Sequence, residues 1–211
     1  MGMIHIHHHK LWLMVALVVV VVEGCLEEER IALLQLKPFF FPSSTEIEEA
    51  AAWGKDSNCC NWTRVECNST AGRVTHLDLT FLHNTSSWYL NCSLFIPFQE
   101  IKSLNLAGNY ILGCLENEGF ERLSNLGNLE VLDLSFNSFD NSILASLGSL
   151  SSLKSLYLSY NKLEGSINIG GEFLCFYNNG YRNSNTTSNQ HTLFSFASLA
   201  PKSQLVRLHF D

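Results

Sequence analysis

The sequence is poor in positive charge. Lysine and arginine together number 13 among 211 residues, against 20 acidic residues, which gives a formal net charge of −7. No stretch gathers the basic side chains into a patch, and such a patch is the electrostatic footprint of nucleic-acid binding. The composition therefore argues against nucleic acid as a partner.

The sequence also lacks a hydrophobic run long enough to cross a membrane. The apolar run over residues 11–22 has twelve residues, whereas a transmembrane helix needs about 20. A run of this length suits the core of a signal peptide, and small residues at Val22 and Gly24 predict cleavage after Gly24. Residues 1–24 are therefore expected to be a signal peptide, and the histidines at residues 5–9 are expected to be part of this leader, not a metal site.

Cysteine is not scarce, and the seven cysteines indicate an oxidising compartment with disulfides. None of the cysteines and histidines stands at a spacing that indicates a nucleophile paired with a base. For Cys92 and Cys114 the sequence is compatible both with a mutual bridge and with an unpaired, buried Cys114, and the pairing of Cys175 stays open.

What the sequence has in abundance is leucine at a fixed spacing. Residues 126–137 read LGNLEVLDLSFN, and 24 residues later residues 150–161 read LSSLKSLYLSYN. A period of this size is typical of a solenoid, in which each unit buries its apolar face against a neighbour. The alternation LDL places Leu132 and Leu134 inward on a short strand. Asn137 follows where the chain leaves that strand, so its amide is expected to pair with backbone groups of adjacent turns.

This pattern resembles the plant extracellular leucine-rich repeat, LxxLxxLxLxxNxLxGxIPxxLGxL. Leu163, Gly165 and Ile167 match the LxGxI part, although Asn168 stands where a proline normally follows. The third leucine of each repeat marks four units with spacings of 27, 28 and 24 residues: Leu77, Leu104, Leu132 and Leu156. The resemblance implies an α/β leucine-rich repeat solenoid with short parallel β-strands on its concave face.

Residues 25–72 have a different pattern. The spacing of apolar residues predicts a helix over 25–37, with the acidic residues 27–29 in a solvated first turn and Pro38 at its end. ALLQLK over 32–37, the paired cysteines at 59–60 and GRVTHLDL over 72–79 resemble the plant N-terminal capping module of leucine-rich repeat proteins. The resemblance implies a disulfide-bonded helical cap with the bridges Cys25–Cys59 and Cys60–Cys67.

The expected organisation is a signal peptide over 1–24, the cap over 25–72, repeats over 73–167, an irregular loop or degenerate repeat over 168–193 and a truncated repeat over 194–211. The last segment ends within a repeat, which indicates the N-terminal piece of a longer receptor. N-x-S/T acceptors support secretion and glycan-covered loops, and they are Asn61, Asn68, Asn84, Asn91 and Asn185.

The resemblance implies a binding module without enzymatic activity or cofactor: the ectodomain portion of a plant receptor-like protein in cell-surface signalling. Its expected partners are an extracellular peptide, protein or glycan and a co-receptor kinase. Full-length, it is expected at the plasma membrane, anchored through segments that this chain lacks, and as a fragment in the apoplast. The residues available for contact flank the inward leucines, namely His76, Asp78, Lys102, Asn105, Glu130, Asp133, Phe136, Lys154, Tyr157 and Tyr160.

Two alternatives remain. One is a soluble apoplastic inhibitor of a cell-wall hydrolase, similar to polygalacturonase-inhibiting proteins, which share the cap and the repeats. The other is a secreted hydrolase, which requires a convergent acid–base or nucleophilic constellation. The candidate groups for such a constellation are repeat scaffold or helix surface, so the hydrolase has the weaker support.

Overall fold

The computed structural model describes residues 24–42, 48–83, 86–115, 119–169, 172–177, 180–181, 192–195 and 205–209. Residues 1–23 of the expected signal peptide lie outside these ranges, and so do Asn84 and Asn185. From residue 165 onward only the backbone is described.

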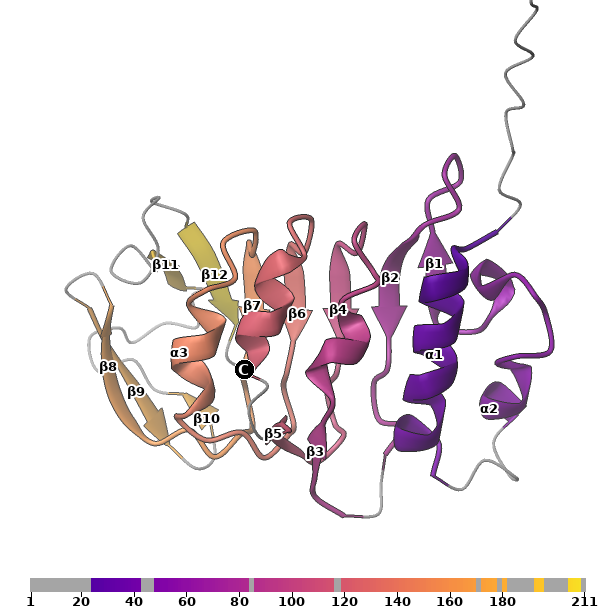
Figure 1. Ribbon diagram of the computed structural model, residues 1–211. Coiled ribbons are helices and arrows are strands. Elements are labelled where there is room, and N and C mark those ends of the chain that lie inside the picture. The colour runs from indigo at the N-terminus through magenta and orange to yellow at the C-terminus, as the bar shows by residue number, and fades with distance from the viewer. Residues whose placement is uncertain are drawn as a thin grey trace, which may run out of the picture.

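Short strands, one from each repeat, form the main sheet of the molecule (Figure 1). They are β2 (Val74–Asp78), β4 (Ser103–Asn105), β6 (Val131–Asp133) and β7 (Ser155–Tyr157). All four are parallel, and the register aligns the marker leucines Leu77, Leu104, Leu132 and Leu156 with one another. These leucines are buried, as the alternating pattern predicted, so each strand turns one face to the core and the other to solvent.

Helical segments cover the inward face of this sheet, and Figure 1 shows α1 and α3 standing on that side. The segments are α1 (Glu27–Phe40), η2 (Cys92–Phe95), η3 (Phe120–Asn125) and α3 (Ile143–Leu147). A small second sheet pairs β3 (Trp88–Leu90) with β5 (Ile111–Cys114). The chain therefore returns to the start of each strand through a helical turn, which makes the strands parallel.

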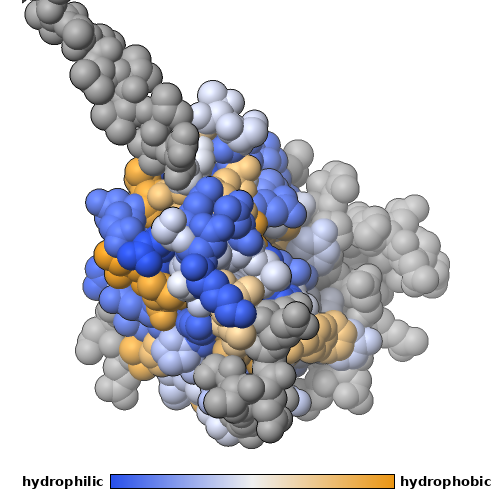
Figure 2. Space-filling view, turned by 90° about the vertical axis from the view of Figure 1, so that its right-hand side faces the viewer, coloured by the Kyte–Doolittle hydropathy of each residue, from blue (hydrophilic) through white to orange (hydrophobic). Residues whose placement is uncertain are grey.

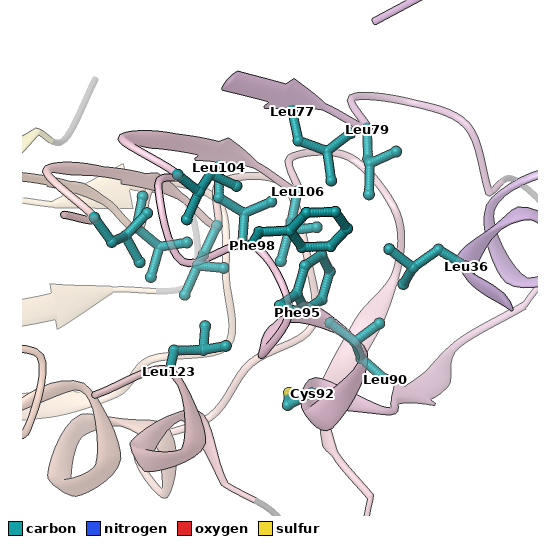
Figure 3. Packing of buried hydrophobic residues seen from close by; sticks show 14 of the residues in the cluster. Leu36, Leu77, Leu79, Leu90, Cys92, Phe95, Phe98, Leu104, Leu106 and Leu123 are labelled. Atoms are coloured by element: carbon teal, nitrogen blue, oxygen red, sulfur yellow. The ribbon is translucent and has the colours of Figure 1, made fainter. Parts of the chain in front are cut away.

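The core lies between the strands and the helical segments (Figure 3). Leu36 of α1 points into it from the cap, and Phe95 and Phe98 fill its centre with ring centroids 6.4 Å apart. Phe120 and Phe139 pack edge to face one repeat further on, at 5.5 Å. Because cap and repeats share one continuous apolar cluster, the first repeat has no exposed apolar end.

The cap is held by two disulfides, Cys25–Cys59 and Cys60–Cys67. It also contains α2 (Glu48–Ala52), η1 (Cys59–Asn61) and β1 (Val65–Cys67), and β1 adds an antiparallel edge strand to β2. Lys37 Nζ donates to the Trp53 carbonyl at 2.7 Å, which ties α1 to the chain that follows α2. The end of the molecule seen from the cap side carries many hydrophilic side chains (Figure 2).

Two expectations about α1 are wrong. The helix does not end at Pro38 but runs two residues further, to Phe40, because burial of Phe40 against the first repeat compensates for the hydrogen bond that proline cannot donate. The first turn is not fully solvated either, since Glu29 is completely buried. Its Oε1 accepts from Arg73 Nε at 2.9 Å and its Oε2 from Val74 N at 3.3 Å, so this carboxylate joins the cap to the first strand.

A third disulfide, Cys92–Cys114, joins η2 to β5 and decides between the two possibilities that the sequence left open for these residues. It closes a loop across the side of the second repeat. The side chain of Cys175 lies outside what the structure describes.

Beyond β7 the described backbone leaves the repeat pattern. The sequence predicted an irregular loop or degenerate repeat over 168–193. Over residues 165–181, the described backbone forms three strands that pair antiparallel with one another. The strands are β8 (Gly165–Ile169), β9 (Glu172–Tyr177) and β10 (Gly180–Tyr181). The solenoid resumes at β12 (Leu205–His209), which is parallel to β7 with Leu208 opposite Leu156. β11 (Thr192–Ser195) covers the outer edge of β12.

Candidate binding face

A ladder of buried asparagines fixes the end of each strand. Asn137 Oδ1 accepts from the N–H groups of Asn109 and Ile111 at 3.1 and 2.9 Å, and its Nδ2 donates to three carbonyls, those of Leu106, Leu134 and Ser135, at 2.9–3.1 Å. Asn109 likewise accepts from two N–H groups, those of Leu82 and His83, and donates to the Leu79 carbonyl. Asn161 accepts from one N–H among the described residues, that of Phe139, and donates to the carbonyls of Leu134 and Leu158. Since these amides satisfy backbone that the bend would otherwise bury unpaired, the strands are stacked rigidly enough to present a fixed surface.

That surface is the solvent side of β2, β4, β6 and β7 together with the strand exits, and it is called the sheet face below. All ten side chains predicted for ligand contact lie on these strands or next to their ends. The exposed ones are His76, Asp78, Lys102, Phe136, Lys154 and Tyr160, and those partly buried are Asn105, Glu130, Asp133 and Tyr157.

Three of the ten have a structural task as well. Asp78, Asn105 and Asp133 each end a strand, and the Oδ1 atom of each accepts from the backbone N–H two residues further on, at 2.9–3.0 Å. Such a turn closes the strand exit locally. These side chains therefore leave only their second polar atom for a ligand.

The opposite ends of the strands carry charges of both signs. Lys154 Nζ lies 2.7 Å from Glu130 Oε1. The hydrogen bond from Lys154, together with the charges of Lys154 and Lys102, lowers the pKa of Glu130 below its ordinary value of 4.5. Because these groups are exposed, the pair contributes little to stability and leaves charged atoms available to a partner.

Aromatic rings line the strand exits. Phe136 and Tyr160 stack with centroids 4.3 Å apart and an angle of 13° between their planes. Phe81, which the sequence analysis did not single out, contacts Phe136 at 5.9 Å. The signal was present, because Phe81, Phe136 and Tyr160 occupy the same position in their repeats, directly before the asparagine of the ladder or its equivalent. Tyr110 is a further exposed ring close to the strand exits.

The remaining candidate groups are the metal-ligating side chains and the buried His83. No group of three or more His, Cys, Asp or Glu side chains there is placed to hold a metal ion. His83 is buried, and its ring nitrogens face the carbonyls of Phe39 and Ser86 at 2.6 and 3.1 Å, so it holds the end of α1 against the first repeat. Among the described residues no helix is long and apolar enough to cross a membrane.

The described glycan acceptors lie outside the four strands of the sheet face. Asn61 is in η1, Asn68 follows β1 and Asn91 precedes η2. The Nδ2 atom of Asn61 donates to Asp56 Oδ2 at 2.8 Å, and this hydrogen bond lowers the pKa of Asp56.

Comparison with known proteins agrees with this architecture. Residues 26–68 match the model of the leucine rich repeat N-terminal domain, and residues 128–150 and 152–175 match the leucine rich repeat. Receptor-like protein 14 of Arabidopsis thaliana is 39% identical over 160 residues, which cover 69% of this chain and 16% of that protein. Cuscuta receptor 1 of Solanum lycopersicum is 41% identical over 134 residues, covering 61% of this chain and 12% of that protein.

A solved structure is similar as well. It is the leucine-rich repeat ectodomain of the plant membrane receptor kinase GASSHO1/SCHENGEN3 from Arabidopsis thaliana, in complex with CASPARIAN STRIP INTEGRITY FACTOR 2. The similarity has a TM-score of 0.50 at 30% identity and covers 66% of this chain and 16% of that chain.

Fold, cap and site together define a leucine-rich repeat protein with a disulfide-bonded N-terminal cap. Within that class the chain belongs with the plant leucine-rich repeat receptor-like proteins, of whose length it spans less than a fifth in the relatives above. These relatives favour the receptor interpretation over the soluble inhibitor.

Proposed function

We propose that this chain recognises an extracellular ligand through its sheet face, as part of a plant receptor-like protein in cell-surface signalling. The observation that carries the proposal is the sheet face itself. It is a rigid parallel sheet with exposed charged and aromatic side chains, and the described glycan acceptors lie elsewhere.

The proposed ligand is an extracellular peptide, protein or glycan, and a co-receptor kinase is the proposed signalling partner. The complex described for the receptor kinase ectodomain above supports this kind of ligand. In this proposal the chain acts by binding and not as an enzyme, since Asp78 and Asp133 are used in strand-exit turns and Glu130 is used in a surface ion pair. It works outside the cell or at the cell surface, with glycans on Asn61, Asn68 and Asn91.

A pair of single substitutions tests the sheet face, because each creates a new glycan acceptor. Asp133→Asn makes the sequence N-L-S over 133–135, on the sheet face. Gly127→Ser makes N-L-S over 125–127, beside η3 on the helical side, where an added Cβ meets no atom within 4 Å. The full chain is secreted from plant cells, and glycan occupancy is measured by mass spectrometry.

The probes are synthetic 12-residue peptides selected from a random display library on the wild-type chain. The glycan at 133 is expected to abolish peptide binding, and the glycan at 125, created by Gly127→Ser, is expected to leave it unchanged. Treatment with a peptide N-glycosidase, which leaves aspartate at the attachment position, must then restore binding at 133. Equal binding by both glycosylated variants and the wild type would show that the sheet face is not the binding surface.

A further inference from the structure

Three exposed aromatic residues have a left-handed backbone conformation at the same position of three repeats. Phe81, Phe136 and Tyr160 have side chains that are 65%, 47% and 46% exposed, and their φ angles are 54°, 55° and 55°. Backbone in this left-handed region suits glycine or asparagine, and bulky side chains are strained there. Strain that recurs in exposed apolar residues at one position is typical of a functional surface.

The same position in the second repeat is Gly108, with φ 72°. A Cβ at 108 would overlap the ring of Phe81, so the glycine provides the space in which Phe81 lies across the second repeat. Phe81 thereby reaches Phe136, two repeats away from its own strand. Phe81, Phe136 and Tyr160 thus form one continuous row, called the aromatic row below.

The backbone holds this row in place. The N–H groups of Phe81, Gly108 and Phe136 each donate to a carbonyl of the next repeat at 2.9 Å. The row therefore inherits the spacing of the parallel strands and does not depend on flexible loops. Rigid aromatic groups of this kind lose little entropy on binding and are common energetic anchors of protein interfaces.

The arrangement of the rings selects the kind of partner. Phe136 and Tyr160 turn one ring face each to the other, so these two faces are closed to a ligand. A sugar ring would need a broad open aromatic face, whereas the smaller apolar and prolyl side chains of a polypeptide can pack between and beside neighbouring rings in a row. The row therefore fits a polypeptide better than a glycan.

Charge next to the row defines the partner further. Asp78 and Asp133 precede Phe81 and Phe136 by three residues. Asp78 lies 3.8 Å from Arg64 Nη1, whereas Asp133 has no ion pair within the described residues and accepts a hydrogen bond only from its own turn. A carboxylate in this situation attracts a basic side chain.

We propose that the aromatic row and Asp133 form a docking site for an extended polypeptide segment that carries apolar or prolyl side chains beside a lysine or arginine. This inference rests on the proposed function and names the ligand class for one edge of the same sheet face. The segment runs along the row and places its basic residue at Asp133.

The test replaces each aromatic residue of the row by glycine, the residue that already stands at 108. The row variant carries Phe81→Gly, Phe136→Gly and Tyr160→Gly. Glycine relieves the left-handed strain but adds unfolded-chain entropy, and these effects roughly cancel, so the unfolding temperature is expected to stay unchanged. Tyr110→Gly is the matched control, because Tyr110 has φ 57° and is 52% exposed but has no ring contact with the row in the described residues.

The library-selected peptides are expected to bind the row variant at least about ten-fold more weakly than the wild type or Tyr110→Gly. Replacing their basic residues by glutamine is expected to weaken binding to the wild type by a similar factor. An unfolding temperature that falls as after a core substitution would assign the rings a structural role and overturn the proposal. Binding of cellohexaose or an oligogalacturonide to the wild type, with loss in the row variant, would overturn it in favour of a glycan.

Failure of this proposal is distinguishable from failure of the proposed function. Peptides that are blocked by the glycan at 133 but bind the row variant normally would leave the sheet face as the binding surface and reject the aromatic row. Equal peptide binding with and without the glycan at 133 would show that the sheet face is not the binding surface.

Discussion

Removing one amide of the asparagine ladder is expected to destabilise the solenoid strongly. In Asn137→Ala, the N–H groups of Asn109 and Ile111 lose the acceptor that lies 3.1 and 2.9 Å away in the native protein. Each buried donor left unsatisfied costs roughly 1–3 kcal/mol, so the expected loss in the free energy of unfolding is about 2–6 kcal/mol. That is a large share of the roughly 5–15 kcal/mol by which domains are stable.

The carbonyls that Asn137 contacts add less to this loss, because each keeps a second donor. Leu106 O still accepts from Asn109 Nδ2, and Leu134 O still accepts from Asn161 Nδ2. Ser135 O still accepts from Gly108 N. The estimate therefore rests on the two donors alone.

Asn161→Ala provides a comparison, because it is expected to lose less free energy of unfolding than Asn137→Ala. Its Oδ1 accepts from a single N–H in the described residues, that of Phe139 at 3.0 Å, so a loss of about 1–3 kcal/mol is expected. Asn128→Ala is the surface control, since Asn128 is exposed and donates only to exposed groups. Urea unfolding followed by tryptophan fluorescence measures all three variants. A loss below about 1 kcal/mol for Asn137→Ala, or the same loss in all three variants, would show that the asparagine ladder does not stabilise the solenoid in this way.

Three further changes have defined outcomes. Glu29→Ala leaves Arg73 and a strand N–H without the buried carboxylate, and thermal unfolding is expected to show a loss of about 2–4 kcal/mol; an unchanged midpoint would mean that the cap is held without this contact. Cys92→Ser with Cys114→Ser opens the third disulfide and is expected to cost about 2–4 kcal/mol in urea, whereas a wild-type midpoint would contradict a stabilising bridge. The hydroxyl and N–H of Ser142, together with the charge of Lys162, lower the pKa of Asp140 below 3.8. A carboxylate whose pKa is lower in the folded than in the unfolded protein stabilises the fold at pH values above its unfolded-state pKa. This stabilisation is lost as the pH falls through its folded-state pKa. Between about pH 5 and about pH 3, the unfolding temperature of Asp140→Ala should therefore fall less than that of the wild type. An equal fall would contradict the lowered pKa of Asp140.

The repeats could be predicted closely because their signal is redundant. Leucine spacing, strand alternation and the asparagine at each strand exit all indicate the same unit. The marker leucines therefore pair as predicted, and the ten candidate contact residues lie along one sheet.

The deviations come from contacts between segments that are distant in sequence. Nothing in the run of acids over 27–29 distinguishes Glu29, which is buried because Arg73 approaches it across the cap. Pro38 lies inside α1 because tertiary packing of Phe40 outweighs a local helix-breaking signal. The shared repeat position of Phe81 and Phe136 is visible in the sequence, but their contact is not, because it depends on the absent side chain at Gly108.

The sheet face is proposed as the surface that binds ligand. Photo-crosslinking tests it most directly, with a library-selected peptide that carries benzophenone and with crosslinked residues identified by mass spectrometry. We predict crosslinks to β2, β4, β6 and β7 and to the strand exits beside them. Crosslinks confined to α1, η2, η3 or α3 would place binding on the helical side and contradict it.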